Sequence, residues 1–162
     1  MAEEKRITCV DKLGEEFVVT YGTMSDRPAL AAMYDRFEPK SMTQGLPASD
    51  DAARFEWITM LLETGENFLA WQEGGVMGHS SLIVDRSKSD GEYLIFVEPW
   101  CRQRGIGTVL TRLAVERGRN LKLRSIWLTV EALNFRAIKL YQKMGFVFYD
   151  VGERERTMIL DL

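Results

Sequence analysis

One stretch constrains the fold of this chain more than any other, because an apolar strand pattern ends there at a proline and a helix pattern begins shortly afterwards. It reads Val97-Glu98-Pro99-Trp100-Cys101-Arg102-Gln103-Arg104-Gly105-Ile106-Gly107-Thr108. The first N–H groups of a helix have no acceptor within the helix, and its dipole adds partial positive charge. Glycines let an anion approach the backbone closely, so this strand–turn–helix unit predicts a site for a phosphate group.

Two common phosphate-binding motifs do not fit this turn. A dinucleotide-binding loop needs a third glycine after Gly105 and Gly107, and Leu110 stands in its place. The P-loop pattern that ends in Lys-Ser or Lys-Thr is also absent from the sequence. Taken alone, the turn is a weak signal, and a strand–helix turn with a solvated basic patch is the alternative interpretation.

Hydrophobic periodicity predicts strands and helices along the whole chain, and strands alternate regularly with helices in its later part. The strands are expected at 7–10, 16–21, 67–72, 76–84, 92–97, 124–130, 145–150 and 155–161. Two helices are expected to start at the N-caps Ser25 and Ser49, and two more to span 104–118 and 134–143. This order favours an α/β fold, or α+β on stricter accounting, with a mixed sheet and helices on both faces. We expect one domain over residues 1–162.

Each predicted helix carries an apolar face at helical spacing. These faces hold Leu30, Met33, Tyr34 and Phe37; Ala52, Phe55, Ile58 and Leu62; Ile106, Val109, Leu110, Leu113 and Ala114; and Ala137, Ile138, Tyr141 and Met144. A second apolar side, made by Trp57, Met60 and Leu61, predicts that the second helix is sandwiched between other elements. The sequence Glu73-Gly74-Gly75 predicts a tight hairpin in which both glycines have positive φ.

Composition and charge narrow the choice of partners. The 162 residues hold 21 Lys+Arg against 24 Asp+Glu, a net charge of -3, which argues against nucleic acid as the main partner. The longest apolar run, Tyr93 to Val97, is far shorter than a membrane span, and we find no signal-peptide pattern. Cys9, Cys101 and the single His79 form no zinc-ligand set. We therefore expect a cytoplasmic protein with reduced thiols, without a metal and without a membrane partner.

A second motif follows the glycine-containing turn. Together the two read V-x-P-x-x-R-x-x-G-I-G and, after a helix, L-x-V-x-x-x-N-x-x-A-I-x-L-Y-x-K-x-G-F. This pattern, from Tyr93 to Phe146, closely resembles the GNAT superfamily of N-acetyltransferases. The resemblance implies a strongly twisted, mostly antiparallel sheet in which two central parallel strands, 92–97 and 124–130, splay apart.

The resemblance also implies that acetyl-CoA is the acyl donor and lies in that splay. Its pantetheine arm is expected along the backbone of the first splayed strand, and its pyrophosphate on the N–H groups of the turn. The donor-binding residues implied in this way are Ile95, Phe96, Val97, Arg102, Gln103, Arg104, Gly105, Ile106, Gly107, Thr108, Asn134 and Tyr141.

Attack of an amine on a thioester requires a base for the ammonium, a donor for the oxyanion and an acid for the thiolate. The resemblance gives Tyr141 the role of the acid, and a backbone N–H of strand 92–97 that of the oxyanion donor. The residue pattern alone would make Tyr141 a core aromatic. Glu92 or His79, acting through water, is the candidate base. The alternatives are ordered water without a dedicated side chain and, for His79, a bond to a local backbone carbonyl. Glu98 is interpreted as a solvated turn residue.

The amine acceptor is expected at the loops 37–51 and 149–156. The first loop combines the apolar Phe37, Met42 and Leu46 with the acidic Glu38, Asp50 and Asp51. An acidic rim favours a cationic acceptor, such as a lysine side chain, a peptide N-terminus or a small polyamine. Ordinary solvated carboxylates at a helix start are the alternative. The stretch from Tyr34 to Pro47 is also faintly similar to bacterial protein-lysine acetyltransferases of the Pat type.

Other interpretations stay open. A GNAT-like domain that senses acetyl-CoA or CoA without catalysis is the second functional class, although Tyr141 and Asn134 argue against it. A dinucleotide-binding oxidoreductase is disfavoured by the missing glycine and the antiparallel early strands. Cys101 is either a redox-sensitive or acylated thiol or, as we favour, a small turn residue. A homodimer formed by pairing of the edge strand 155–161 is a further hypothesis.

Overall fold

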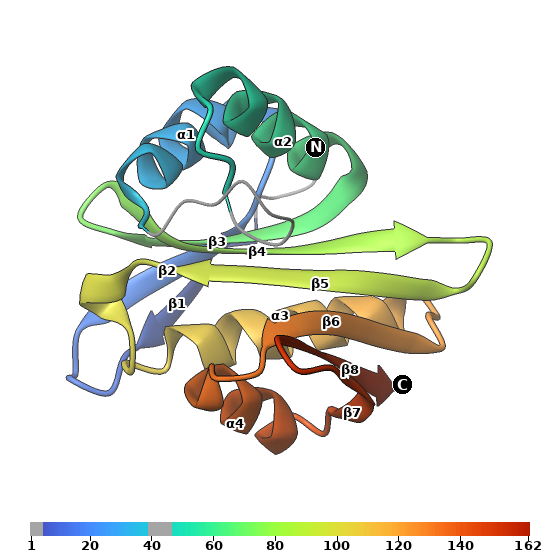
Figure 1. Ribbon diagram of the computed structural model, residues 1–162. Helices are drawn as coiled ribbons and strands as arrows, with labels where there is room; N and C mark the ends of the chain where they lie inside the picture. The colour runs from blue at the N-terminus through green and yellow to red at the C-terminus, as the bar shows by residue number, and fades with distance from the viewer. Residues whose placement is uncertain (1–4, 39–46) are drawn as a thin grey trace.

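A mixed eight-stranded sheet organises the chain in the computed structural model, which describes residues 5–38 and 47–162 (Figure 1). Its strands are β1 (Ile7–Val10), β2 (Glu16–Tyr21), β3 (Gly65–Gln72), β4 (Gly75–Asp85), β5 (Asp90–Val97), β6 (Ser125–Glu131), β7 (Val147–Val151) and β8 (Glu155–Asp161). Their order in the sheet is β1-β2-β3-β4-β5-β6-β8-β7. All neighbours are antiparallel except β5 and β6, which run parallel. The predicted α/β class with a mixed, mostly antiparallel sheet is confirmed.

Helices cover both faces of this sheet, as Figure 1 shows: α1 and α2 lie on one face, α3 and α4 on the other. The helices are α1 (Arg27–Arg36), α2 (Asp51–Thr64), α3 (Ile106–Asn120) and α4 (Phe135–Lys143), with short 3-10 turns η1 (Met24–Asp26) and η2 (Pro99–Cys101). Each face has its own apolar core, one against α3 and α4 and one against α1 and α2. Within residues 5–38 and 47–162, no helix is long and apolar enough to cross a membrane.

The two faces of β5 serve different helices, because successive side chains of a strand point to opposite faces. Tyr93 points toward α3, where its Oη lies 2.9 Å from Thr111 Oγ1. Phe96 points to the opposite face, where its ring centre lies 5.6 Å from those of Tyr34 on α1 and Trp57 on α2. Alternate residues of β5 therefore pack against α3 and α4 on one face and against α1 and α2 on the other.

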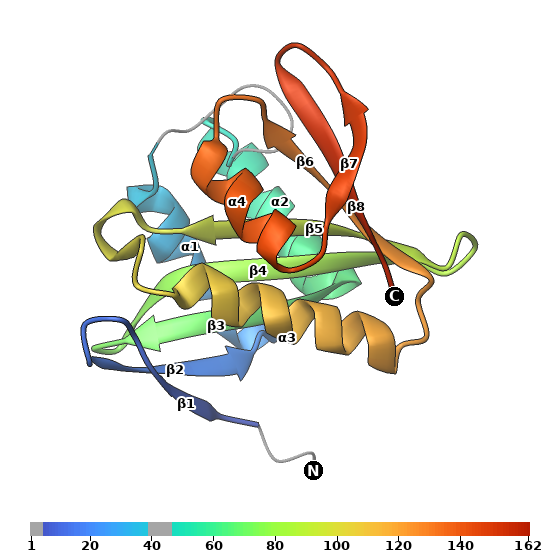
Figure 2. The ribbon, with the colours of Figure 1, turned by 90° about the horizontal axis from the view of Figure 1, so that it is seen from below.

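β5 and β6 pair over a short distance and then diverge, as Figure 2 shows. Their register consists of Asp90↔Ser125, Gly91↔Ile126 and Glu92↔Trp127. Beyond Glu92, β5 stays paired with β4 as far as Val97, and β6 stays paired with β8 as far as Glu131. This confirms the predicted splay between the two central parallel strands.

Two helix starts differ from the predicted ones. Thr23, not Ser25, opens the first helical turn, and its N–H donates to the Asp26 carboxylate at 2.9 Å. Asp50, not Ser49, caps α2 by accepting from the Ala53 N–H at 2.8 Å. At α2 the Asp50 carboxylate accepts from a free helix N–H in place of the predicted Ser49 hydroxyl, whereas at the first turn the Asp26 carboxylate accepts from the N–H of the N-cap residue Thr23 itself.

The predicted buried face of α2 is partly wrong. Ile58 and Leu62 are buried, but Phe55 is 45% exposed and Ala52 is also exposed. Arg54 lies inward instead, because acidic side chains and carbonyl groups surround its guanidinium. The predicted faces of α1, α3 and α4 are buried or packed against the two cores.

Two predictions about the sheet are corrected. The turn between β3 and β4 has positive φ at Glu73 (52°) and Gly74 (79°), rather than at both glycines. The strand at 155–161 is not an edge, because β8 lies between β6 and β7. The edge strand at this end of the sheet is β7, whose Val147, Phe148, Tyr149 and Val151 are exposed, and β1 is the edge at the other end. Pairing through the β8 end of the sheet would therefore use β7 in place of β8.

Candidate active site

The first turn of α3 packs directly against β5 and α4. A Cβ added at Gly107 would lie 3.8 Å from Ile95 Cδ1 and 3.4 Å from Leu140 Cδ2. Gly105 is the N-cap with a left-handed φ of 90°, and no side chain of the described residues caps the helix there. The N–H groups of this turn therefore suit an anion. This geometry fits the pyrophosphate site expected at Arg102–Thr108, which stays a prediction.

Both arginines of the turn are held by other parts of the protein. The Nε of Arg102 donates to the Val97 carbonyl at 3.0 Å, and its guanidinium lies 5.8 Å from the ring centre of Phe37. The guanidinium of Arg104 lies 3.6 Å from the Asp11 carboxylate. These contacts fix the positions of the two arginines beside the main-chain N–H groups of the turn, and Arg102 stays exposed.

Main-chain groups of β5 point into the splay at alternate residues. The Glu98 N–H donates to the Met77 carbonyl on β4 at 2.9 Å, and this direction repeats at every second residue of an antiparallel ladder. The main-chain groups of Val97 and Ile95 therefore face β6, whose pairing with β5 has already ended. Phe96 directs its main chain to β4 and its ring toward α1 and α2.

Two predicted donor-site residues lie on or beside α4. Asn134 is the N-cap of this helix and accepts from the Ala137 N–H at 3.2 Å. Gln103, which has a positive φ of 64°, lies beside Arg136; with its amide oxygen turned toward that guanidinium it accepts at 3.0 Å. The turn before α3 and the first turn of α4 are thereby in direct contact.

Tyr141 projects from α4 into the core shared with α3. It is buried, and its ring centre lies 5.8 Å from that of Phe146. No side chain in residues 5–38 and 47–162 hydrogen-bonds its hydroxyl. Burial raises the pKa of Tyr141, so the phenol keeps its proton at neutral pH. A protonated phenol that no described side chain hydrogen-bonds has the chemistry expected of an acid for a leaving thiolate.

Glu92 occupies the last position at which β5 and β6 are paired, between Ile83 on β4 and Trp127 on β6. It lies on the same face as Phe96, the face that carries α1 and α2. The side chain is partly buried, and burial raises the pKa of its carboxyl. A carboxylate with increased proton affinity is a better proton acceptor than an ordinary exposed one.

His79 is enclosed in a hydrogen-bond network and is 1% exposed. Its Nδ1 lies 2.7 Å from the Tyr34 hydroxyl and its Nε2 2.8 Å from Asn67 Oδ1. The Asn67 amide nitrogen donates to the Leu61 and Gly65 carbonyls, so its oxygen must accept from His79. His79 is therefore protonated on Nε2 and accepts at Nδ1, and burial lowers its pKa to about 3. Side chains, rather than the backbone carbonyl considered above, hold the ring.

Glu98 is not a solvated turn residue. It is 4% exposed, and its carboxylate accepts from Arg36 Nε at 3.2 Å and from the indole N–H of Trp100. Arg36 ends α1, so this ion pair joins α1 to the turn that leads to α3. The sequence analysis missed this pair because its partners lie far apart in the chain and no local pattern links them.

The acidic groups of the predicted acceptor loop have structural partners. Asp50 caps α2, and Asp51 lies 2.6 Å from the buried guanidinium of Arg54. Phe37 is buried in the core against α1 and α2. Glu38 is exposed at the end of the first described segment, and Met42 and Leu46 lie outside the described residues.

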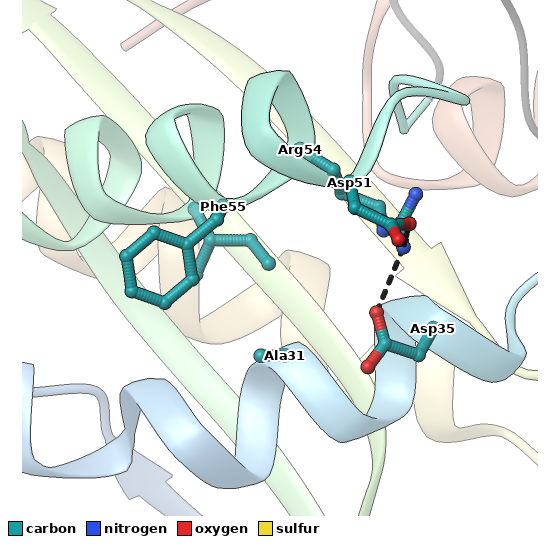
Figure 3. A pocket seen from close by; sticks show the side chains of 6 residues that line it. Ala31, Asp35, Asp51, Arg54 and Phe55 are labelled. Carbon is teal, nitrogen blue, oxygen red and sulfur yellow. Dashed lines mark hydrogen bonds and ion pairs between the residues drawn. The ribbon is translucent and has the colours of Figure 1, made fainter.

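A small cavity of about 240 Å³ lies between α1 and α2 (Figure 3). Its lining is made by Ala31, Asp35, Asp51, Arg54, Phe55 and Ile58. Arg54 also donates to the Ala48 and Ser49 carbonyls at 3.0 and 3.2 Å, and to Asp35 at 2.8 Å. This arrangement ties the residues before α2 to α1, and the cavity is too small for a nucleotide-sized ligand.

The thiol of Cys101 is fully buried and donates to the Glu98 carbonyl at 3.1 Å. Burial, with the Glu98 charge adding to it, raises the pKa of Cys101 to about 11, although Arg104 and Arg102 lower it. A thiol in this state is unreactive, which supports its interpretation as a small turn residue. In the part of the chain that the structure describes, no three His, Cys, Asp or Glu side chains gather as metal ligands.

Comparison with known proteins agrees with this architecture. The acetyltransferase (GNAT) family pattern matches residues 29–146, more than half of the chain. The chain therefore belongs to the acetyltransferase (GNAT) family. This family transfers acetyl groups, with acetyl-CoA as the donor.

Individual relatives are more distant. A segment of 84 residues is 31% identical to the mycothiol acetyltransferase of Thermomonospora curvata; it covers 52% of this chain but only 28% of that protein. The GNAT domain of PAT from S. lividans superposes with a TM-score of 0.83 over 97% of both chains at 15% identity. The putative acetyltransferase YncA of Salmonella typhimurium, solved with acetyl-CoA, superposes with a TM-score of 0.72 at 18% identity, covering 91% of this chain and 95% of that one. At these identities the structural likeness shows the fold alone.

Proposed function

We propose that this protein transfers an acetyl group from acetyl-CoA to a primary amine by direct attack in a ternary complex. One observation carries the proposal: the β5–β6 ladder opens at Glu92, directly beside an α3 N-terminus that no described side chain caps. Main-chain groups of Ile95 and Val97 and the first N–H groups of α3 then face a ligand that is extended at one end and anionic at the other. An acyl-CoA has that shape and charge.

The proposed reaction needs few protein groups. The neutral amine attacks the thioester carbonyl, the C–S bond breaks, and the leaving thiolate takes the phenol proton of Tyr141. A main-chain N–H of β5 stabilises the oxyanion. The raised pKa of Tyr141 supports this assignment, because the phenol stays protonated until a thiolate forms beside it.

For the base we propose Glu92, acting through water, rather than His79. Glu92 is partly exposed, lies at the opening of the splay, and has a raised carboxyl pKa. Both ring nitrogens of His79 are already bonded, and its lowered pKa makes it a poor proton acceptor. We assign His79 a structural role that joins β4 to β3 and α1.

The acceptor that we propose is cationic, a lysine side chain, a peptide N-terminus or a small polyamine. Its support is the face of the sheet that carries Glu92. Glu131 and Glu155 are direct cross-strand partners on β6 and β8, and both are exposed. They share the face of Glu92, because Trp127 pairs with Glu92 and Glu131 follows at an even spacing. Two like charges placed opposite each other favour a bound cation.

The test combines binding and turnover. We would measure the melting temperature with and without saturating acetyl-CoA, and CoA release with a panel of peptide lysines, peptide N-termini and polyamines. At a hundredfold excess over the Kd, binding adds about 2.7 kcal/mol, or roughly 5–11 °C for a domain of this size. A shift that Gly107→Trp removes, together with turnover, supports the proposal. Binding without turnover on any amine would favour a sensor, and no shift with any acyl-CoA would overturn the donor site.

A further inference from the structure

Tyr93 is a buried phenol that the proposed reaction does not use. It lies on β5, is 3% exposed, and points toward α3. Its Oη is 2.9 Å from Thr111 Oγ1, which in turn is 2.7 Å from the Gly107 carbonyl oxygen. A short chain of hydroxyl groups therefore leads from the middle of β5 to the first turn of α3.

The direction of each hydrogen bond follows from the groups present. A carbonyl only accepts, so Thr111 donates its single hydroxyl proton to Gly107. The Thr111 oxygen then accepts from Tyr93. Burial, with the nearby Tyr141 phenol adding to it, raises the pKa of Tyr93, so its hydroxyl keeps its proton and donates at neutral pH.

The hydrogen-bond chain from Tyr93 ends at Gly107, a residue of the proposed donor site. Gly107 lies in the α3 turn whose N–H groups face the pyrophosphate in the proposal above. Ile95, the second residue after Tyr93, packs its Cδ1 against the same glycine, 3.8 Å from the position of a Cβ. Two residues that point to the same face of β5 thus hold one turn of α3, one through a hydrogen bond and one through packing.

We propose that Tyr93 is a positioning residue for the donor, and that its hydroxyl sets the spacing between the α3 N–H groups and the splayed main chain of β5. The inference rests on the proposed function, because it assumes that one ligand contacts both the α3 N–H groups and the β5 main chain. A phenylalanine would fill the same volume, but the phenol adds a directional bond between the middle of β5 and the first turns of α3, where Ile95 supplies only an apolar contact. A ligand that bridges strand and helix binds best when their spacing is already fixed.

Tyr93→Phe tests this proposal because it removes only the hydroxyl. The Kd for CoA and for acetyl-CoA should rise about three- to tenfold, as expected for one buried hydrogen bond. The KM for acetyl-CoA should rise with it, while kcat at saturation stays unchanged, because Tyr93 does not touch the reacting atoms. Thr111→Val should give the same loss, and the double variant should be no worse than either single one.

The matched control is Tyr34→Phe, which removes an equally buried phenol hydroxyl on the opposite face of the sheet. Both Tyr→Phe variants should lower the melting temperature, but only Tyr93→Phe should weaken donor binding, as followed by isothermal titration calorimetry. If Tyr93→Phe loses stability and keeps the wild-type Kd, Tyr93 is purely structural and the inference is wrong. If the wild type itself binds neither CoA nor acetyl-CoA, the proposed function fails as well.

Discussion

The two sides of the sheet differ in the groups that define them, although side-chain pairs such as Arg104–Asp11 also occur beside the donor turn. On the donor side, formed by β5, β6, α3 and α4, the proposed ligand-facing groups are mostly main-chain amides and carbonyls. On the side proposed for the acceptor, called the acceptor side below and formed by α1, α2 and the sheet face beneath them, side chains bond to one another over long sequence separations. Tyr34 bonds His79, Arg36 bonds Glu98, and Arg54 bonds Asp35.

This difference has a physical consequence. Main-chain sites depend on local conformation, so a short motif with glycines at fixed positions is sufficient to specify them. Networks of side chains depend on which distant residues the fold brings together, so each network is specific to its sequence. We therefore expect changes on the donor side to affect acetyl-CoA binding or turnover, and changes in the acceptor-side networks to affect stability first.

The largest effect is expected for Tyr141→Phe. Loss of the acid should lower kcat by about 10²- to 10⁴-fold, because the thiolate must then leave without a proton. The Kd for acetyl-CoA should change little, since the ring and its contact with Phe146 remain. Steady-state assays of CoA release measure kcat, and calorimetric titration measures the Kd for acetyl-CoA. A kcat within threefold of the wild type would remove Tyr141 from the mechanism.

The second prediction concerns the acceptor side. His79→Leu leaves the Tyr34 hydroxyl and the Asn67 oxygen buried without their partner. We expect a loss of about 2–4 kcal/mol in the free energy of unfolding, measured in urea, with an unchanged Kd for acetyl-CoA. Adding Tyr34→Phe should recover part of the loss, because the phenol would no longer be unpaired. A large change in donor affinity with intact stability would contradict the division between the two sides.

The pH dependence of stability follows from the same histidine. The pKa of His79 is lowered from 6.5 to about 3 in the folded state. Between these two values the unfolded chain binds a proton at His79 and the folded chain does not. The contribution is fully present above pH 6.5 and is lost as the pH falls toward 3. At pH 4.5, two units below the unfolded value, the loss is about 2.7 kcal/mol. His79→Gln, which does not titrate, should show a correspondingly flatter profile in urea unfolding between pH 7 and 4.5. Parallel profiles would show that His79 is not buried as a neutral ring.

Glu92→Gln is expected to have a smaller effect, because water transfers the proton. We expect a fall of roughly 10- to 100-fold in kcat/KM at pH 8. In the wild type, activity should decrease as the pH falls through the raised pKa of the carboxyl, since its protonated form accepts no proton. The variant should lack this acidic limb. Full activity of Glu92→Gln across the whole pH profile would leave ordered water as the only base.

The sequence allowed much of the donor side to be predicted and little of the acceptor side. The splay of 92–97 and 124–130, the turn at Gly105 and Gly107, and the burial of Tyr141 follow from local patterns and a motif. The burial of Arg54 in place of Phe55 does not, because a charged residue is expected outside unless distant partners neutralise it. Glu98 was misplaced for the same reason, since its partner Arg36 lies on another element.

The most direct test of this account is a ¹⁵N–¹H correlation spectrum recorded while CoA is added. The account predicts the largest shifts at the amides of Ile95 and Val97 and in the first turn of α3, at Ile106, Gly107 and Thr108. The amides of α2 should move little. Shifts concentrated in α1 and α2, with the first turn of α3 unchanged, would contradict it.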